Sequence, residues 1–330
     1  MPMRKLKLIT AVTLAVLGMY LVLNYSYIGD ISREILGFSN DSILRNASFD
    51  AAEDSDSSFP PDMQAPSESE SPEIFPSTEE NIVPTTISGG LNIKNSSSYI
   101  VNVKEMLVAG CAVKLKKDEP QILIIHTHSS EAYSPAGLDR YDDSGGNRTQ
   151  DNNYNVIRIG DELEQLLSAL GLNVIHDRGV YDYPSYTGSY TKCGEAIQSY
   201  LKEHPSISIV IDLHRDALGT DDVTYKTVAT ETGVCASQLM FVMGTDECGL
   251  EHPNWKGNLS LALYLQNAVS EKYPTLMRPI TLVEYRYNEH LAPGSLILEV
   301  GSNGNTIQEA LAAIRLFADA AGPALLDLVE

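Results

Sequence analysis

Histidines and carboxylates follow several apolar stretches of this sequence, and side chains of these types can bind a metal ion. The run ILIIHTHSSEAY (122–133) sets four apolar residues before His126 and His128, and Glu131 follows shortly after. A second apolar run, IVIDLH, ends in His214. Zinc in hydrolytic sites typically takes three protein ligands from histidine and carboxylate and keeps a fourth position for water. We therefore predict a Zn²⁺ site formed by His128, Glu131 and His214.

A third apolar run, LILEV, carries Glu299, where an unpaired charge would be costly. Bound zinc lowers the pKa of its water, and a nearby carboxylate is then needed to accept the water's proton and pass it to the leaving group. We predict that Glu299 is this catalytic base. The alternative is a structural carboxylate paired with Arg215.

Four further polar residues receive weaker assignments. His126 is expected to support the ligands from just outside the zinc shell, because it can face the same way as His128. Asp151 is the rival to Glu131 as a ligand, although we favour a helix N-cap for it. His176 and His204 are expected to face solvent.

The elements that must position these side chains follow from the hydrophobic pattern. Short apolar runs alternate with amphipathic segments of helical spacing, which predicts an α/β fold with a mainly parallel sheet flanked by helices. In such sheets, ligand sites form beyond the carboxyl ends of the strands, so residues distant in sequence can meet there. The strands are predicted at 121–128, 172–177, 207–217, 237–245 and 294–306, and the helices at 154–171, 189–205, 254–274 and 307–330.

The chain divides into three segments. Residues 1–28 place a basic flank before about twenty mostly apolar residues, which predicts a single transmembrane anchor with everything after it outside the cytoplasm. A cleaved signal peptide is the alternative. Residues 29–90 are acidic and rich in Ser and Pro, which predicts a disordered linker. Residues 91–330 form the predicted extracytoplasmic catalytic domain.

The net charge and the cysteine spacing argue against a nucleic-acid-binding protein and against a cysteine-ligated zinc site. The net charge of −21 argues against nucleic acid as a partner, because phosphate binding needs basic surface. The four cysteines are widely spaced and form no C-x-x-C pair, so they do not resemble zinc ligands.

The segments PQILIIHTHSSEAY, YDYPSYTGSY, IVIDLHRDA and YNEHLAPGSLILEVGSNGNT together resemble the stage II sporulation protein P family of endospore-forming bacteria. The resemblance runs from about residue 91 to the C-terminus. It implies the fold of zinc-dependent N-acetylmuramoyl-L-alanine amidases, with a related arrangement in zinc carboxypeptidases. The family motif T-H-x-x-E falls on His128 and Glu131, D-x-H-R-D falls on His214 and Arg215, and E-V-G-x-x-x-N-T begins at Glu299.

The resemblance also implies a function. The protein would hydrolyse peptidoglycan by cutting the amide between N-acetylmuramic acid and L-alanine, with an endopeptidase activity on cross-linked stem peptides. It would act at the septal membrane while the forespore is engulfed, with stage II sporulation proteins D and M as partners. A zinc carboxypeptidase or endopeptidase of cell-wall peptides is the alternative, and a non-catalytic wall-binding module is the third hypothesis.

Contacts to such a substrate are assigned from residue type. Arg215 could hold a stem-peptide carboxylate, unless it pairs with Asp216. Asn288 and His290 precede the strand that carries Glu299 and are expected to line the cleft. A loop of Tyr183, Tyr186 and Tyr190 is expected to pack on sugar or peptide, or else to be ordinary packing.

Overall fold

A computed structural model describes residues 81–330 apart from four short gaps at 137–140, 142–146, 221–222 and 231–232. The predicted anchor and most of the predicted linker lie outside the described residues. Within the described part, no helix combines the length and apolar character needed to cross a bilayer. The last residues of the predicted linker do form structure, because Asn81–Thr85 is strand β1 and pairs in parallel with β6 (Val223–Thr227).

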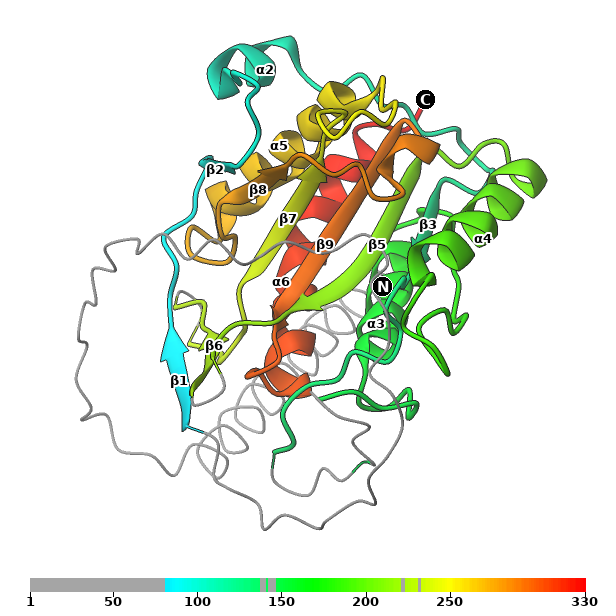
Figure 1. The fold of residues 1–330 in the computed structure, drawn as a ribbon. Coiled ribbons are helices and arrows are strands. Elements are labelled where there is room, and N and C mark those ends of the chain that lie inside the picture. Colours follow the sequence, from blue (N-terminus) through cyan, green and yellow to red (C-terminus); the bar gives the residue numbers. More distant parts are fainter. Residues whose placement is uncertain (1–80, 137–140, 142–146, 221–222, 231–232) are drawn as a thin grey trace, which may run out of the picture. The chain divides into compact units, whose positions relative to one another are not determined.

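The centre of the fold is a seven-stranded sheet (Figure 1). Every neighbouring pair in it is parallel except β7–β9, so the prediction of an α/β fold with a mainly parallel sheet is confirmed. In spatial order the strands are β2 (Ile93–Asn95), β8 (Ile280–Val283), β7 (Leu239–Gly244), β9 (Gly294–Ser302), β5 (Ile209–Asp216), β3 (Ile122–Ile125) and β4 (Val174–His176).

Helices cover both faces of this sheet. Three long helices, α3 (Val156–Ala169), α5 (Trp255–Lys272) and α6 (Ile307–Leu326), share one buried cluster with the sheet. A second cluster joins β3 and β5 to α4 (Ser189–Glu203). Two shorter elements are α2 (Val103–Ala109) and the 3₁₀ helix η1 (Glu289–Leu291).

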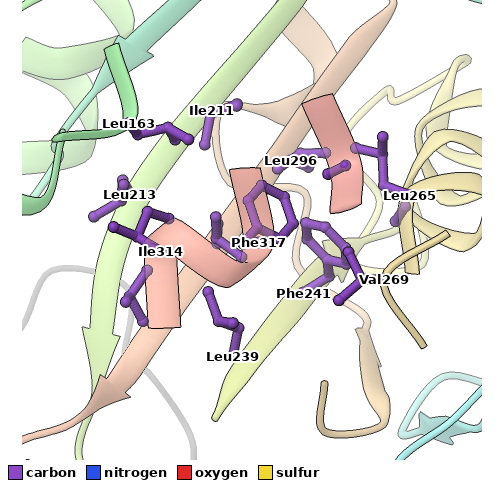
Figure 2. Close-up of a cluster of buried hydrophobic side chains, with 14 of the residues drawn as sticks. Leu163, Ile211, Leu213, Leu239, Phe241, Leu265, Val269, Leu296, Ile314 and Phe317 are labelled. Carbon is purple, nitrogen blue, oxygen red and sulfur yellow. The ribbon is translucent and has the colours of Figure 1, made fainter. Parts of the chain in front are cut away.

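The larger core lies between the sheet and the α3, α5 and α6 layer. Figure 2 shows apolar side chains of β5, β7 and β9 packed on Phe317 and Ile314 of α6. Phe317 and Phe241 meet edge to face with ring centroids 6.1 Å apart. Strand side chains alternate between faces. Because Leu213 of β5 joins this core, the flanking residues Asp212 and His214 point to the α4 face instead.

The ends of the helices are set by local hydrogen bonds. The Asn155 side chain accepts the N–H of Ile157 and caps α3. Thr306 and Glu309 form a reciprocal capping box at the start of α6, which satisfies two of its free N–H groups. That cap fixes the Gly/Asn loop in which β9 ends.

Candidate metal centre

Three neighbouring parallel strands, β3, β5 and β9, run in the same direction and end at the same edge of the sheet. His128 and Glu131 follow β3, while His214 lies near the end of β5. Glu299 of β9 is the register partner of His214. Because paired residues in a sheet point to the same face, Glu299 and His214 are adjacent on the α4 side.

The three predicted ligands are neighbours, but their donor atoms do not all lie within 4.8 Å of one another. The rings of His128 and His214 are 5.4 Å apart between centroids, at an interplanar angle of 81°. Glu131 Oε2 lies 3.3 Å from His214 Nδ1. All three residues are buried. Two ligand atoms on a tetrahedral zinc with bonds near 2.0–2.1 Å lie roughly 3.3 Å apart, so the Glu131–His214 pair has the spacing that zinc requires.

His128 completes the donor set in chemical type but faces another partner. Its Nε2 lies 3.0 Å from the hydroxyl of Tyr186, and its ring stacks on Tyr186 at 4.4 Å between centroids. Its Nδ1 lies 3.4 Å from the hydroxyl of Ser189, so either nitrogen would exchange a hydroxyl contact for the metal. Two histidine nitrogens and one carboxylate remain the donor set that hydrolytic zinc sites use, so the residues fit the metal.

A second carboxylate orients His214. Asp212 Oδ1 lies 2.9 Å from His214 Nε2, as an ion-pair contact rather than an aligned hydrogen bond. Asp212 also accepts the backbone N–H of Thr127 at 2.8 Å and its hydroxyl at 2.6 Å. Carboxylates behind a ligating imidazole commonly fix its orientation. Asp212 was not among the predicted site residues, although its spacing of two from His214 places both on one face of β5.

The pKa values of the buried ionisable groups in the site depend on burial and on the neighbouring charges. Burial alone would lower the pKa of His214, but Asp212 and Glu131 outweigh burial and hold this pKa well above its usual range. Burial would raise the pKa of Glu131, yet His214 and Arg215 bring it below its usual range. Burial lowers the pKa of His128 to about 4, so its nitrogens are free of an extra proton at neutral pH.

Glu299 is set apart from the other carboxylates. Burial, followed by the repulsion of Asp216, raises its pKa to about 8. Its Oε2 atom is buried and has no hydrogen-bond partner within the described part of the chain. The predicted alternative, a pairing with Arg215, is not seen in the described contacts. Glu299 is therefore a carboxyl group beside the candidate ligands whose oxygen is available for proton transfer.

Arg215 has a structural role in place of the predicted substrate contact. It is buried, its Nε donates to the carbonyl of Ala132 at 2.9 Å, and its Nη2 donates to that of Asn147 at 3.2 Å. Its backbone N–H donates to Glu131 Oε2 at 3.1 Å, which holds that candidate ligand in place. The Asp216 carboxylate pairs with Arg278 instead, at 2.6 Å.

Asn288 and His290 are half-buried around η1. The Asn288 amide donates to the carbonyl of Tyr190 at 2.9 Å and so ties η1 to α4 beside the site. The ring of His290 packs edge-on against His252, with centroids 6.4 Å apart. The structure thus places Asn288 behind the tyrosine loop and His290 beside a second histidine, and neither is in hydrogen-bond contact with the candidate ligands in the described contacts.

Three other expectations for polar residues are wrong. His176 is buried, not solvent-facing, and its Nε2 lies 2.8 Å from Nε2 of His126. That contact places His126 against β4 and α3, so it does not share the direction of His128.

The cap of α3 is Asn155, while exposed Asp151 accepts the N–H of Asn153 in the preceding turn. Because Asp151 is exposed, it is also a poor rival to buried Glu131. His204 is half-exposed beside Glu203 at the end of α4.

Tyrosines surround the open side of the site. Tyr183 and Tyr186 remain 56% and 49% exposed, respectively, and Tyr190 meets the ring of His128 edge-on at 5.4 Å. Tyr190 also packs against Tyr287, whose φ of 47° is uncommon for a bulky residue. Arg148 lies over the Tyr186 ring at 5.1 Å. Sequence reasoning missed Tyr287 and Arg148, since no local pattern marks them.

Solved structures with a similar fold include amidases. The N-acetylmuramoyl-L-alanine amidase AmiC2 of Nostoc punctiforme is 14% identical with a TM-score of 0.39, and the match covers 64% of this chain and 97% of that chain. The N-acetylmuramoyl-L-alanine amidase from Clostridium difficile 630 is 12% identical with a TM-score of 0.37, covering 64% of this chain and 97% of that chain.

Sequence relatives give the family. The stage II sporulation protein P of Bacillus subtilis (strain 168) is 25% identical over 217 residues, which cover 61% of this chain and 50% of the relative. The chain thus spans about half the length of the curated relative that it matches. The family model for stage II sporulation protein P (SpoIIP) matches residues 29–322, far more than half of the sequence. The chain therefore belongs to the stage II sporulation protein P family.

Proposed function

We propose that the protein is a zinc-dependent peptidoglycan hydrolase that cleaves the amide between N-acetylmuramic acid and L-alanine. The observation that supports this most is the juxtaposition of Glu299 with His214 and Glu131 at the carboxyl edge of the sheet. Family membership agrees with it, because the matched proteins are sporulation proteins. The substrate and the bond in this proposal are those that the family resemblance implies.

His128, Glu131 and His214 would hold the zinc ion, which when bound lowers the pKa of water and polarises a carbonyl. Asp212 keeps the His214 ring in place, and the Arg215 N–H keeps Glu131 Oε2 in place. Glu299 takes the proton from the attacking water on its free oxygen and delivers it to the amide nitrogen as the C–N bond breaks. Its pKa of about 8 leaves the carboxyl mostly protonated at neutral pH, and the positive charge of a zinc ion beside it would lower this pKa toward the range in which a carboxyl group both accepts and releases a proton.

The surroundings of the site would bind the wall polymer. Exposed Tyr183 and Tyr186 offer aromatic surfaces for sugar or peptide, and Tyr186 stacks directly on His128. We further propose that the predicted anchor in residues 1–28 holds the domain outside the cytoplasm at the septal membrane, where peptidoglycan lies. Cooperation with stage II sporulation proteins D and M belongs to the same proposal.

A digest of purified peptidoglycan by the full chain, with products identified by mass spectrometry, tests the proposal. An amidase leaves muramic acid without its peptide and frees an intact stem peptide. Release of a terminal amino acid alone would mean a carboxypeptidase, and cleavage within cross-links alone would mean an endopeptidase. No soluble product from the zinc-loaded chain would contradict a hydrolytic function.

A further inference from the structure

A second cluster of metal-ligating side chains lies on the opposite side of the sheet from α4. Asp161 and Glu164 are three residues apart on α3 and so share a helix face, and His176 ends β4. His176 Nδ1 lies 3.3 Å from Asp161 Oδ1 and 3.6 Å from Glu164 Oε2. Among the described residues, this is the one group of three whose donor atoms all lie within 4.8 Å of one another.

Hydrogen bonds behind His176 fix which of its nitrogens carries hydrogen. His126 Nδ1 lies 2.8 Å from the carbonyl oxygen of Leu213, and a carbonyl only accepts, so this nitrogen donates. In a neutral ring, His126 Nε2 is then an acceptor. It lies 2.8 Å from His176 Nε2, which must therefore donate. His176 Nδ1 is left with a lone pair.

This lone pair faces the carboxylates of Asp161 and Glu164, which can also only accept hydrogen bonds. The His176 side chain is fully buried, and Nδ1 has no hydrogen-bond partner within the described part of the chain. A buried polar atom without a partner is costly, and facing two carboxylates makes it more so. A cation between the three atoms would satisfy all of them. We propose that Asp161, Glu164 and His176 form a second binding site for a divalent metal ion of the zinc type, which accepts mixed nitrogen and oxygen ligands.

The Arg178 guanidinium supplies part of that positive charge in this structure. Its Nη2 lies 2.5 Å from Asp161 Oδ1 and 2.6 Å from Glu164 Oε2, so the guanidinium balances the carboxylates. It does not donate to His176 Nδ1, which stays without a hydrogen bond. The Arg178 side chain is 45% exposed, and its Nη1 also donates to the carbonyl oxygen of His176 at 3.1 Å. A metal ion thus competes with Arg178 for the two carboxylates, and the removal of Arg178 strengthens metal binding.

Gly160 makes the arrangement possible. A Cβ atom at this position of α3 would lie 2.5 Å from His176 Nε2 and 2.7 Å from His126 Nε2. The absence of a side chain lets the two rings meet, and their hydrogen bonds connect the cluster to Leu213, the residue before His214. The inference does not depend on the proposed hydrolase activity, because the two sites share no residue.

Zinc content tests the inference. The full chain is equilibrated with zinc sulfate, desalted and measured by inductively coupled plasma mass spectrometry. With both sites present, wild type should hold about two zinc ions per chain, and the double variant Asp161→Asn, Glu164→Gln should hold about one fewer. The control Arg178→Gln removes the same ion pairs and keeps the ligands. It should bind zinc more tightly than wild type in a chelator competition.

The outcomes separate the two sites. Loss of about one zinc ion per chain in the Asp161, Glu164 double variant supports this inference, whether or not His128→Ala also loses zinc from the proposed catalytic site. Equal zinc content in wild type and the double variant, with no gain in Arg178→Gln, would mean an arginine-centred ion-pair network only and would overturn the inference. A zinc-dependent rise in Tm gives a second measurement, expected to be larger than that of wild type in Arg178→Gln and smaller than that of wild type in the double variant.

Discussion

Glu299 stands directly beside His214, because β9 and β5 pair in parallel with these two residues in register. Neither residue carries information about the other in the local sequence, since 84 positions lie between them. The pairing brings a carboxyl of raised pKa next to an imidazole that two other carboxylates hold. The consequences of that arrangement can be measured.

The first prediction concerns the carboxylate behind His214. Asp212→Asn removes the charge that orients the imidazole but keeps the size of the side chain. Supporting partners of this kind are worth about 10–100-fold in metal affinity, so we expect a loss of that size in a chelator titration. The matched control is Asp246→Asn, whose carboxylate accepts the hydroxyl of Tyr99 at 2.8 Å, and its zinc affinity should equal that of wild type. Equal zinc affinities of Asp212→Asn and Asp246→Asn would show that Asp212 does not support the metal site.

The second prediction concerns pH and Glu289. This carboxyl is buried, and burial raises its pKa well above its usual range even though Oε2 accepts the N–H of Gly244. The folded state thus keeps a proton that the unfolded chain releases above about pH 4.3. Its stabilising contribution is complete below that pH and is lost as the pH rises toward the folded-state pKa, by up to about 1.4 kcal/mol per pH unit.

Glu289→Gln tests this sign. The glutamine is neutral at every pH and can still accept the Gly244 N–H, so the variant should lack the decline. Urea unfolding from about pH 4.5 to 8 should show a free energy of unfolding that increasingly exceeds that of wild type as the pH rises. Two curves that stay parallel over this range would show that Glu289 has an ordinary pKa in the folded protein.

The third prediction concerns the hydrophobic core between the sheet and α6. Phe317 of α6 is 1% exposed and packs against Phe241 of β7. Phe317→Ala should lower the free energy of unfolding by about 3–5 kcal/mol, because a cavity replaces the ring. Arg315→Ala on the exposed face of α6 removes only a surface ion pair with Glu162 and should cost no more than about 1 kcal/mol. Similar urea midpoints for the two variants would contradict this packing.

The sequence predicted the sheet because buried parallel strands are continuous apolar runs. ILII and IVIDL are of this kind, and the alternation with amphipathic helices identified the α/β class. Strands β1, β6 and β8 were missed because they are short or polar and depend on a partner for their structure. The antiparallel pairing of β7 with β9 could not be predicted from the sequence either, because the relative direction of two strands depends on tertiary packing.

The candidate ligands could be predicted because separate apolar runs end in histidine or carboxylate, and the carboxyl ends of parallel strands meet at one edge of the sheet. The error at His176 has a physical cause. Its burial depends on Gly160, which opens space under α3 for a ring from β4, and no local pattern shows that contact. Arg215 was misjudged for a similar reason, because backbone carbonyls distant in sequence occupy its guanidinium.

The most direct test of the account is Glu299→Gln in the full chain, with zinc content and peptidoglycan digestion measured on the same preparation. The substitution keeps the shape of the side chain and removes its ability to take a proton. The account predicts a zinc content equal to wild type and a loss of amide cleavage of at least about 100-fold, the lower end for a general base. His128→Ala and His214→Ala should lose zinc and cleavage together. Full cleavage by zinc-loaded Glu299→Gln would contradict the central claim.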